Sequence, residues 1–181
     1  MNQPCIIPYK GIFPKIDQGV FIAHTAAIIG DVTIKTGSGI WFNCVLRGDV
    51  EPITIGHNTN IQDGTVVHCT RGGGKTIIGD NVTIGHKALI HACTLQDASF
   101  IGMGAILMDN VVVETGGMVA AGSLVTPNKI IRKGELWAGN PAKFFRNLSQ
   151  EEADFIYISA ENYYKHVQEY LSELLIEPKT I

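Results

Sequence analysis

The sequence predicts an all-β protein, a triangular parallel β-helix of hexapeptide repeats that is followed by one C-terminal α-helix. Large aliphatic residues recur every six positions over most of the chain, and this period stops after residue 141. The composition agrees, because 20 of the 181 residues are glycine and only 8% are aromatic. Many glycines suit a chain with many tight corners.

The hexapeptide period is carried by anchor positions that hold Ile, Leu or Val everywhere except the last, which is Trp137. An α-helix turns every 3.6 residues and a strand alternates every two, so neither alone explains a period of six. In a triangular β-helix each hexad forms one flat side and one corner, and three hexads close one coil. The anchors are Ile22, Ile28, Ile34, Ile40, Leu46, Ile55, Ile61, Val67, Ile78, Ile84, Ile90, Leu95, Ile101, Leu107, Val113, Val119, Val125, Ile131 and Trp137.

The chain is expected to divide into a β-helix domain with an N-terminal lead-in, residues 1–141, and a C-terminal helix that packs on the prism, residues 142–181. Ser149 and Glu152 have the spacing of a capping box, which marks a helix start. A helix over residues 150–175 would place one apolar stripe toward the prism. The stripe consists of Ile156, Tyr163, Val167, Tyr170 and Leu174.

The composition also limits the function. With 45% apolar residues and a net charge of −3, the chain is neither disordered nor suited to nucleic acid. No apolar run is long enough to span a membrane, and the first residues lack the features of a secretory signal. Four scattered cysteines are expected to be free thiols. We therefore expect a cytoplasmic protein without membrane or nucleic-acid partners.

Two histidines are expected to stack on neighbouring coils. His68 and His91 each follow an anchor directly. Residues 71–75 form an insertion between them, and once it is discounted the two histidines are three hexads apart, which is one coil. The two Cα atoms should then lie about 5 Å apart, and the two imidazoles could share one metal ion.

A third histidine, His86, stands two positions after its anchor and is expected on a different face. It would reach the same ion only from a symmetric neighbour, and three-fold symmetry suits a triangular prism. Three neutral histidines with an open fourth position are typical of a catalytic metal site. By the same arithmetic Arg47 lies one coil below His68, and Asp63 lies one coil below His86. These charged residues are either support for the histidines or ordinary corner residues that form salt bridges.

The chain resembles the gamma-class carbonic anhydrases from about residue 11 to residue 175. The resemblance depends on three histidines in the spacing His-x17-His-x4-His and on several motifs around them. These are Arg47-Gly48-Asp49, Asn60-Ile61-Gln62-Asp63-Gly64, Ile84-Gly85-His86 and Gly139-Asn140-Pro141-Ala142-Lys143.

The resemblance implies a left-handed β-helix and a homotrimer with one metal, zinc or else iron or cobalt, at each subunit interface. His68 and His91 would bind it from one subunit and His86 from its neighbour. Metal-bound hydroxide would attack carbon dioxide and give bicarbonate. The implied roles of the other residues are an intersubunit pair of Arg47 and Asp49, orientation of the solvent by Gln62, support by Asp63, lining of the pocket by Asn60, and a helix tyrosine facing the metal, Tyr163 or Tyr164.

The sequence differs from the archetypal pattern in the loop after His68, which is short and contains no carboxylate. Val50 stands where a proton-shuttling glutamate is expected, with Glu51 next to it. Two alternatives therefore stay open: a hexapeptide-repeat acyltransferase, which needs one histidine and no metal, and a non-catalytic metal-binding trimer. Metal content separates the acyltransferase from the other two.

Overall fold

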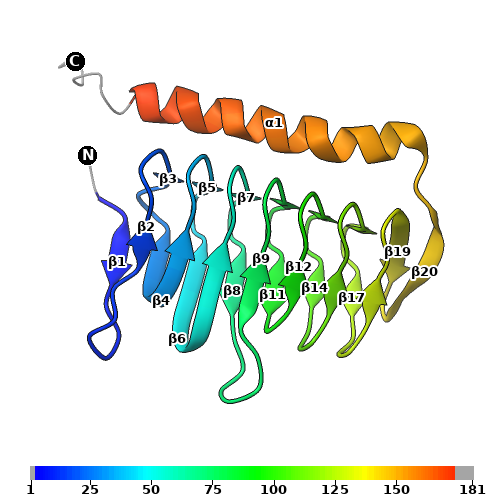
Figure 1. Cartoon of the computed structure of the whole chain (residues 1–181), viewed down its shortest axis with the longest axis horizontal. Helices are drawn as coiled ribbons and strands as arrows, with labels where there is room; N and C mark the ends of the chain where they lie inside the picture. Colours follow the sequence, from blue (N-terminus) through cyan, green and yellow to red (C-terminus); the bar gives the residue numbers. More distant parts are fainter. Residues whose placement is uncertain (1–2, 174–181) are drawn as a thin grey trace.

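The chain winds into a parallel β-helix whose coils follow one another along a single axis, and a long helix lies along the same axis (Figure 1). This description is of a computed structural model and covers residues 3–173. The predicted fold class is confirmed, because almost all strand pairs are parallel and join neighbouring coils.

The coils have three flat sides. Two long strands, β4 (Ala27–Ile34) and β6 (Val45–Ile55), run around the corner between the first and second sides. The first side also holds β1 (Cys5–Ile7), β8 (Val66–His68), β11 (Leu89–His91), β14 (Ile106–Leu107) and β17 (Leu124–Val125). The second also holds β2 (Lys15–Ile16), β9 (Thr76–Ile78), β12 (Thr94–Leu95), β15 (Val112–Val113) and β18 (Ile130–Ile131). The third holds β3 (Phe21–Ile22), β5 (Gly39–Ile40), β7 (Asn60–Ile61), β10 (Thr83–Ile84), β13 (Phe100–Ile101), β16 (Met118–Val119), β19 (Glu135–Gly139) and β20 (Ala142–Asn147).

The anchors fill the interior of the prism. Every anchor from Ile28 to Ile131 is at most 1% exposed, whereas Ile22 and Trp137 at the two ends are only partly buried. The stacked aliphatic side chains form one continuous core, and their burial supplies the main stabilisation of the solenoid.

The corners carry backbone conformations that few residues adopt easily. Five asparagines have positive φ angles, and an asparagine tolerates the left-handed region better than most residues. Aspartates contribute differently: Asp80 accepts a hydrogen bond from the backbone N–H of His57 (2.6 Å). The asparagines are Asn43, Asn58, Asn81, Asn110 and Asn128.

Two insertions interrupt the regular coils, as the sequence predicts. The register between β4 and β6 shifts from Gly30 opposite Gly48 to Val32 opposite Ile53. Residues 70–75 form a projecting turn between β8 and β9, closed by an isolated bridge between Thr70 and Gly74 (Figure 1). Both insertions lie at the corner between the first and second sides.

The chain leaves the prism through an antiparallel hairpin of β19 and β20, which the hexapeptide pattern did not predict. Helix α1 (Gln150–Glu173) then begins at the expected capping box: Ser149 Oγ accepts from Glu152 N (3.2 Å), and Glu152 Oε2 accepts from Ser149 N (3.0 Å). The helix runs back along the third side, where it packs against β3, β5, β7 and β10.

The expected stripe of α1 does face the prism. Ile156 and Val167 are 1% exposed, and Trp41 lies against the rings of Tyr163 (5.5 Å between centroids) and Tyr170 (5.2 Å). Leu174, the last predicted stripe residue, lies outside the described residues. Within residues 3–173 no helix is long and apolar enough to cross a membrane.

Candidate metal centre

The two stacked histidines lie at the ends of neighbouring strands on the first side. His91 of β11 pairs in register with His68 of β8, because the insertion at 70–75 is accommodated as a projecting turn. The ring centroids are 5.3 Å apart. His68 Nδ1 lies 3.3 Å from His91 Nε2.

Each of these histidines contacts a carboxylate through its other ring nitrogen. His68 Nε2 lies 2.9 Å from Asp49 Oδ1, and His91 Nδ1 lies 3.1 Å from Asp109 Oδ2. An ionised carboxylate only accepts hydrogen bonds, so these outer ring nitrogens must carry the protons. In the neutral imidazoles, the inner nitrogens then both present lone pairs.

Two lone pairs that face each other so closely repel unless a proton or a metal cation lies with them. Their separation fits a metal, because two nitrogens bound tetrahedrally to zinc lie about 3.3 Å apart. A histidine ligand that donates its second N–H to a carboxylate is typical of metal sites. The residues present therefore fit a divalent metal, as far as one chain provides them.

The electrostatics of the two carboxylates favour their ionised forms. Burial raises the pKa of Asp49, but hydrogen bonds from His68 and Arg47 outweigh it and hold this pKa below its ordinary value. The hydroxyl of Thr70, and after it the ring of His91, holds the pKa of Asp109 below its ordinary value. Both side chains are therefore negatively charged acceptors at neutral pH.

Arg47 and Asp49 pair within one chain, with Arg47 Nη1 2.6 Å from Asp49 Oδ2. Within one chain Asp49 thus joins Arg47 to His68. The pair between subunits that the family resemblance implies stays a prediction. The side chain of Arg47 is 44% exposed.

His86 lies apart from the other two histidines. It occupies the corner after β10, where the first side begins, whereas His91 ends the strand that follows. His86 and Lys87 form the turn at this corner, and His91 lies at the far end of β11, so the two histidines stand at opposite edges of the first side. Among residues 3–173, no three His, Cys, Asp or Glu side chains are grouped to hold a metal ion.

His86 nevertheless has the same kind of support as the other two. Its Nδ1 lies 2.8 Å from Asp63 Oδ2, and Asp63 comes from the coil below, as the hexad arithmetic predicts. The carboxylate of Asp63 again contacts one ring nitrogen, and the other, Nε2 of His86, is not in contact with that carboxylate. Both side chains are 41% exposed.

A network of buried polar groups stands beside His86. Gln62 is 6% exposed and donates from Nε2 to Asn60 Oδ1 (3.1 Å). Asn60 in turn donates to Thr83 Oγ1 (2.9 Å), and Thr83 lies 3.3 Å from Ser159 Oγ of α1. The amide of Gln62 is thus held in one orientation, with its carbonyl oxygen left to accept.

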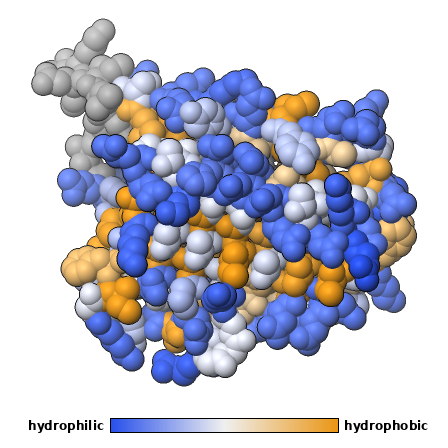
Figure 2. All heavy atoms as spheres, in the orientation of Figure 1, coloured by the Kyte–Doolittle hydropathy of each residue, from blue (hydrophilic) through white to orange (hydrophobic). Residues whose placement is uncertain are grey.

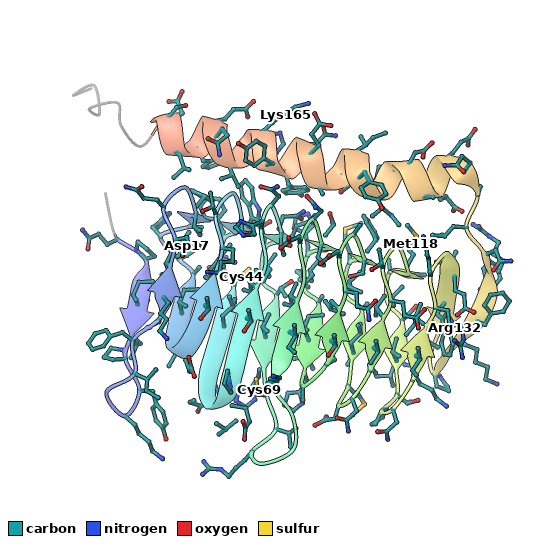
Figure 3. The ribbon with its side chains drawn as sticks, in the orientation of Figure 1. Asp17, Cys44, Cys69, Met118, Arg132 and Lys165 are labelled. Atoms are coloured by element: carbon teal, nitrogen blue, oxygen red, sulfur yellow. The ribbon has the colours of Figure 1, made fainter. Side chains whose placement is uncertain are left out.

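An apolar pocket of about 450 Å³ opens next to this network, between the third side and α1. Gln62, His86 and Tyr163 belong to its lining. Met118, below α1 in Figure 3, is among its apolar residues. Burial, and after it the charge of Asp63, raises the pKa of Tyr163, so its hydroxyl is protonated. The other candidate, Tyr164, lies instead against Gly37.

The cysteines near the histidines are thiols. Burial raises the pKa of Cys93 to about 12 and also raises that of Cys69, which lies at the corner of the projecting turn (Figure 3). Both side chains are 1% exposed and belong to the core inside the prism, whereas the two imidazoles lie on its outer face.

Sequence reasoning missed Asp109 and Thr70. Asp109 stands three hexads after His91 and two positions after the anchor Leu107. Extending the coil arithmetic by one further coil pairs His91 with Met108, because Ile90 pairs with Leu107, and Asp109 is the next residue along the chain. The contact of Thr70 could not be found in this way, because residue 70 belongs to the projecting turn.

Carbonic anhydrases are among the known proteins whose sequences are similar to this chain. No protein-family model matches the chain. It is 39% identical over 170 residues to a carbonic anhydrase of Geobacillus kaustophilus, an alignment that covers 91% of this chain and 93% of that protein. It is 56% identical over 165 residues to the mitochondrial gamma carbonic anhydrase 2 of Arabidopsis thaliana, covering 88% of this chain and 59% of the plant protein. The chain thus spans about three-fifths of that relative.

Solved structures show the same fold under other names. A hexapeptide transferase family protein from Anaplasma phagocytophilum is 52% identical, with a TM-score of 0.89, and the match covers 92% of this chain and 98% of that one. A Bacillus cereus protein described as a putative acetyltransferase is 38% identical, with a TM-score of 0.92 and coverage of 95% and 99%.

Proposed function

Because the chain belongs to the gamma carbonic anhydrase family, we propose that it hydrates carbon dioxide reversibly to bicarbonate at a metal site shared between the subunits of a homotrimer. The observation that supports this most directly is the pair of facing nitrogens on His68 and His91, whose outer nitrogens are both engaged by carboxylates. Such a pair is half of a tetrahedral site and calls for a third ligand.

His86 of a neighbouring subunit is the proposed third ligand. In one subunit His68 and His91 lie at one edge of the first side, and His86 lies at the opposite edge. When subunits pack around a three-fold axis, the first edge of one subunit can meet the second edge of its neighbour, and each such junction completes one site. The first side is suited to burial, because Val66, Leu89 and Ile106 are exposed there in register, on the face that also bears His68 and His91. Figure 2 shows hydrophobic side chains among the strands below α1.

A divalent metal held by three neutral imidazoles supplies a nucleophile from water at neutral pH. We propose zinc, with iron or cobalt as metals that the same ligands accept. Within this chain the amide of Gln62 would orient the reacting oxygen through its free carbonyl, and Asn60 would keep that amide in place. The apolar pocket beside Gln62, His86 and Tyr163 suits an apolar substrate such as carbon dioxide.

Two measurements on purified protein test this function. Elemental analysis should find about one metal per chain, and stopped-flow assays should detect carbon dioxide hydration. His86→Ala should lose both properties, whereas His57→Ala, a variant of an exposed histidine outside the site, should keep both. Metal-loaded wild type that hydrates carbon dioxide no faster than His86→Ala would exclude the enzyme and leave the non-catalytic metal-binding trimer.

The acyltransferase is the second candidate, favoured by the names of the two solved structures and by the size of the apolar pocket. Carbon dioxide needs far less space than about 450 Å³, and a pocket of this size admits larger organic ligands. Acetyl-group transfer from acetyl-coenzyme A in the presence of a chelator would favour this reading.

We also propose a reducing compartment such as the cytoplasm, because the four cysteines are unpaired.

A further inference from the structure

We propose that Asp109 is a positioning residue for His91, that Thr70 locks Asp109, and that the projecting turn at residues 70–75 thereby controls how tightly the site binds its metal. This inference rests on the proposed function, because it concerns the same metal centre. It adds two residues and one structural element that neither the motifs nor the comparisons assign.

The first step is the geometry of the carboxylate. Asp109 Oδ2 accepts from His91 Nδ1 at 3.1 Å, and Asp109 Oδ1 accepts a hydrogen bond from Thr70 Oγ1. With both oxygens engaged, the carboxylate cannot rotate without breaking a contact. It therefore fixes His91 with its proton on Nδ1 and with Nε2 directed at His68.

The second step is the origin of Thr70. It belongs to the coil of His68, yet it reaches past the coil of His91 to a residue one coil further on. The turn itself is ordered by two hydrogen bonds: Thr70 N donates to Gly74 O (3.3 Å), and Gly72 N donates to Glu51 Oε1 (3.1 Å). Its far end is tied to the ligand strand, because Thr76 Oγ1 donates to His68 O (2.7 Å).

The third step is a contrast between the two ligands. The carboxylate on His68, Asp49, is held by the charged guanidinium of Arg47 at 2.6 Å. The carboxylate on His91 is held by a neutral hydroxyl from a projecting turn. The site thus has one support within the β-helix and one that depends on the conformation of residues 70–75.

The test measures cobalt(II) affinity of the full-length protein by competition with a chelator, together with the visible spectrum of bound cobalt, which reports ligand geometry. Asp109→Asn should bind about ten- to a hundredfold more weakly with an altered spectrum. Thr70→Val should bind about two- to tenfold more weakly, and Thr70→Ser, which keeps the hydroxyl, should restore wild-type binding. A variant that combines Thr70→Val with Asp109→Asn should bind cobalt no more weakly than Asp109→Asn alone, because Thr70 acts through Asp109.

Asp97→Asn is the matched control, since Asp97 is a corner carboxylate that accepts from the backbone of Asp80 (2.9 Å); it should bind cobalt like the wild type. Circular dichroism and melting curves establish that each variant is folded. If Asp109→Asn does not fold, the comparison of Thr70→Val with Thr70→Ser decides. If Thr70→Val and Thr70→Ser have the same cobalt affinity and spectrum, or if Asp109→Asn matches the wild type in both, this inference is overturned and the proposed function is not affected. Wild type that takes up no metal would overturn the proposed function as well.

Discussion

A site divided between subunits can be tested by mixing two inactive variants. His68→Ala and His86→Ala each remove one ligand from every site, but the two residues lie at opposite ends of the first side of the prism. In a mixed oligomer, a junction that takes its first side from a His86→Ala subunit and its third ligand from a His68→Ala subunit holds all three histidines.

The expected magnitude follows from chance assembly. In an equimolar mixture each of the two positions at a junction has even odds of holding the required variant, so about a quarter of the junctions are intact. Metal content and carbon dioxide hydration should then recover to about a quarter of the wild-type values. The variants are coexpressed with different tags. Tandem purification isolates the mixed oligomers, and because each mixed trimer has one intact junction of three, recovery in that fraction should be about a third of the wild-type values.

The control uses two lesions in the same half-site. His68→Ala mixed with His91→Ala should recover nothing, because both ligands come from one chain and are in register on β8 and β11. Mixed His68→Ala and His86→Ala oligomers that stay free of metal would refute the shared site, as would recovery in the His68→Ala and His91→Ala mixture.

Three further predictions concern stability. Removing the metal with a chelator should lower the melting temperature, by the equivalent of about 4 kcal/mol where the free metal exceeded its dissociation constant a thousandfold; calorimetry with and without chelator checks this, and unchanged melting would contradict metal binding. Ile101→Ala, in the sealed core, should cost about 2–5 kcal/mol and Ile101→Val about 0.5–1.5 kcal/mol; urea titrations that give equal losses would contradict tight packing. The hydrogen bond from Arg146, and after it that from the N–H of Ser149, lowers the pKa of Glu152 from 4.5 to about 2. The stabilisation that ionised Glu152 contributes is therefore present above pH 4.5 and lost as the pH falls toward 2. The unfolding free energies of wild type and Glu152→Gln, measured against pH, should become equal at low pH, and a difference that stays constant with pH would refute this.

Most of the fold was predictable because one physical constraint repeats along the chain. Each anchor must fill the same prism interior, so a period of six residues specifies the sides, the coils and even the two insertions. The same arithmetic brought His68 over His91 without any structural information. Strand β19 still carries the last anchor, Trp137, and pairs parallel with β16. Strand β20 has no such period and pairs antiparallel with β19.

The site was predictable only where side chains follow the register. The ion pair of Arg47 with Asp49 depends on how two neighbouring side chains turn at a corner, which spacing does not determine. The contact of Thr70 with Asp109 depends on the conformation of an insertion. Positive φ angles at Lys87 and Ala92 were also unexpected, because stacked corners impose them whatever residue is present.

The path of α1 has a consequence for how the molecule unfolds. A solenoid in which each repeat contacts only its neighbours can fray from either end, one repeat at a time. Here the helix starts beside the final hairpin and packs against β3 and β5 of the earliest coils (Figure 1). Opening the first coils must therefore also release the last segment of the chain, so the two ends should exchange their amide hydrogens in one cooperative event rather than independently.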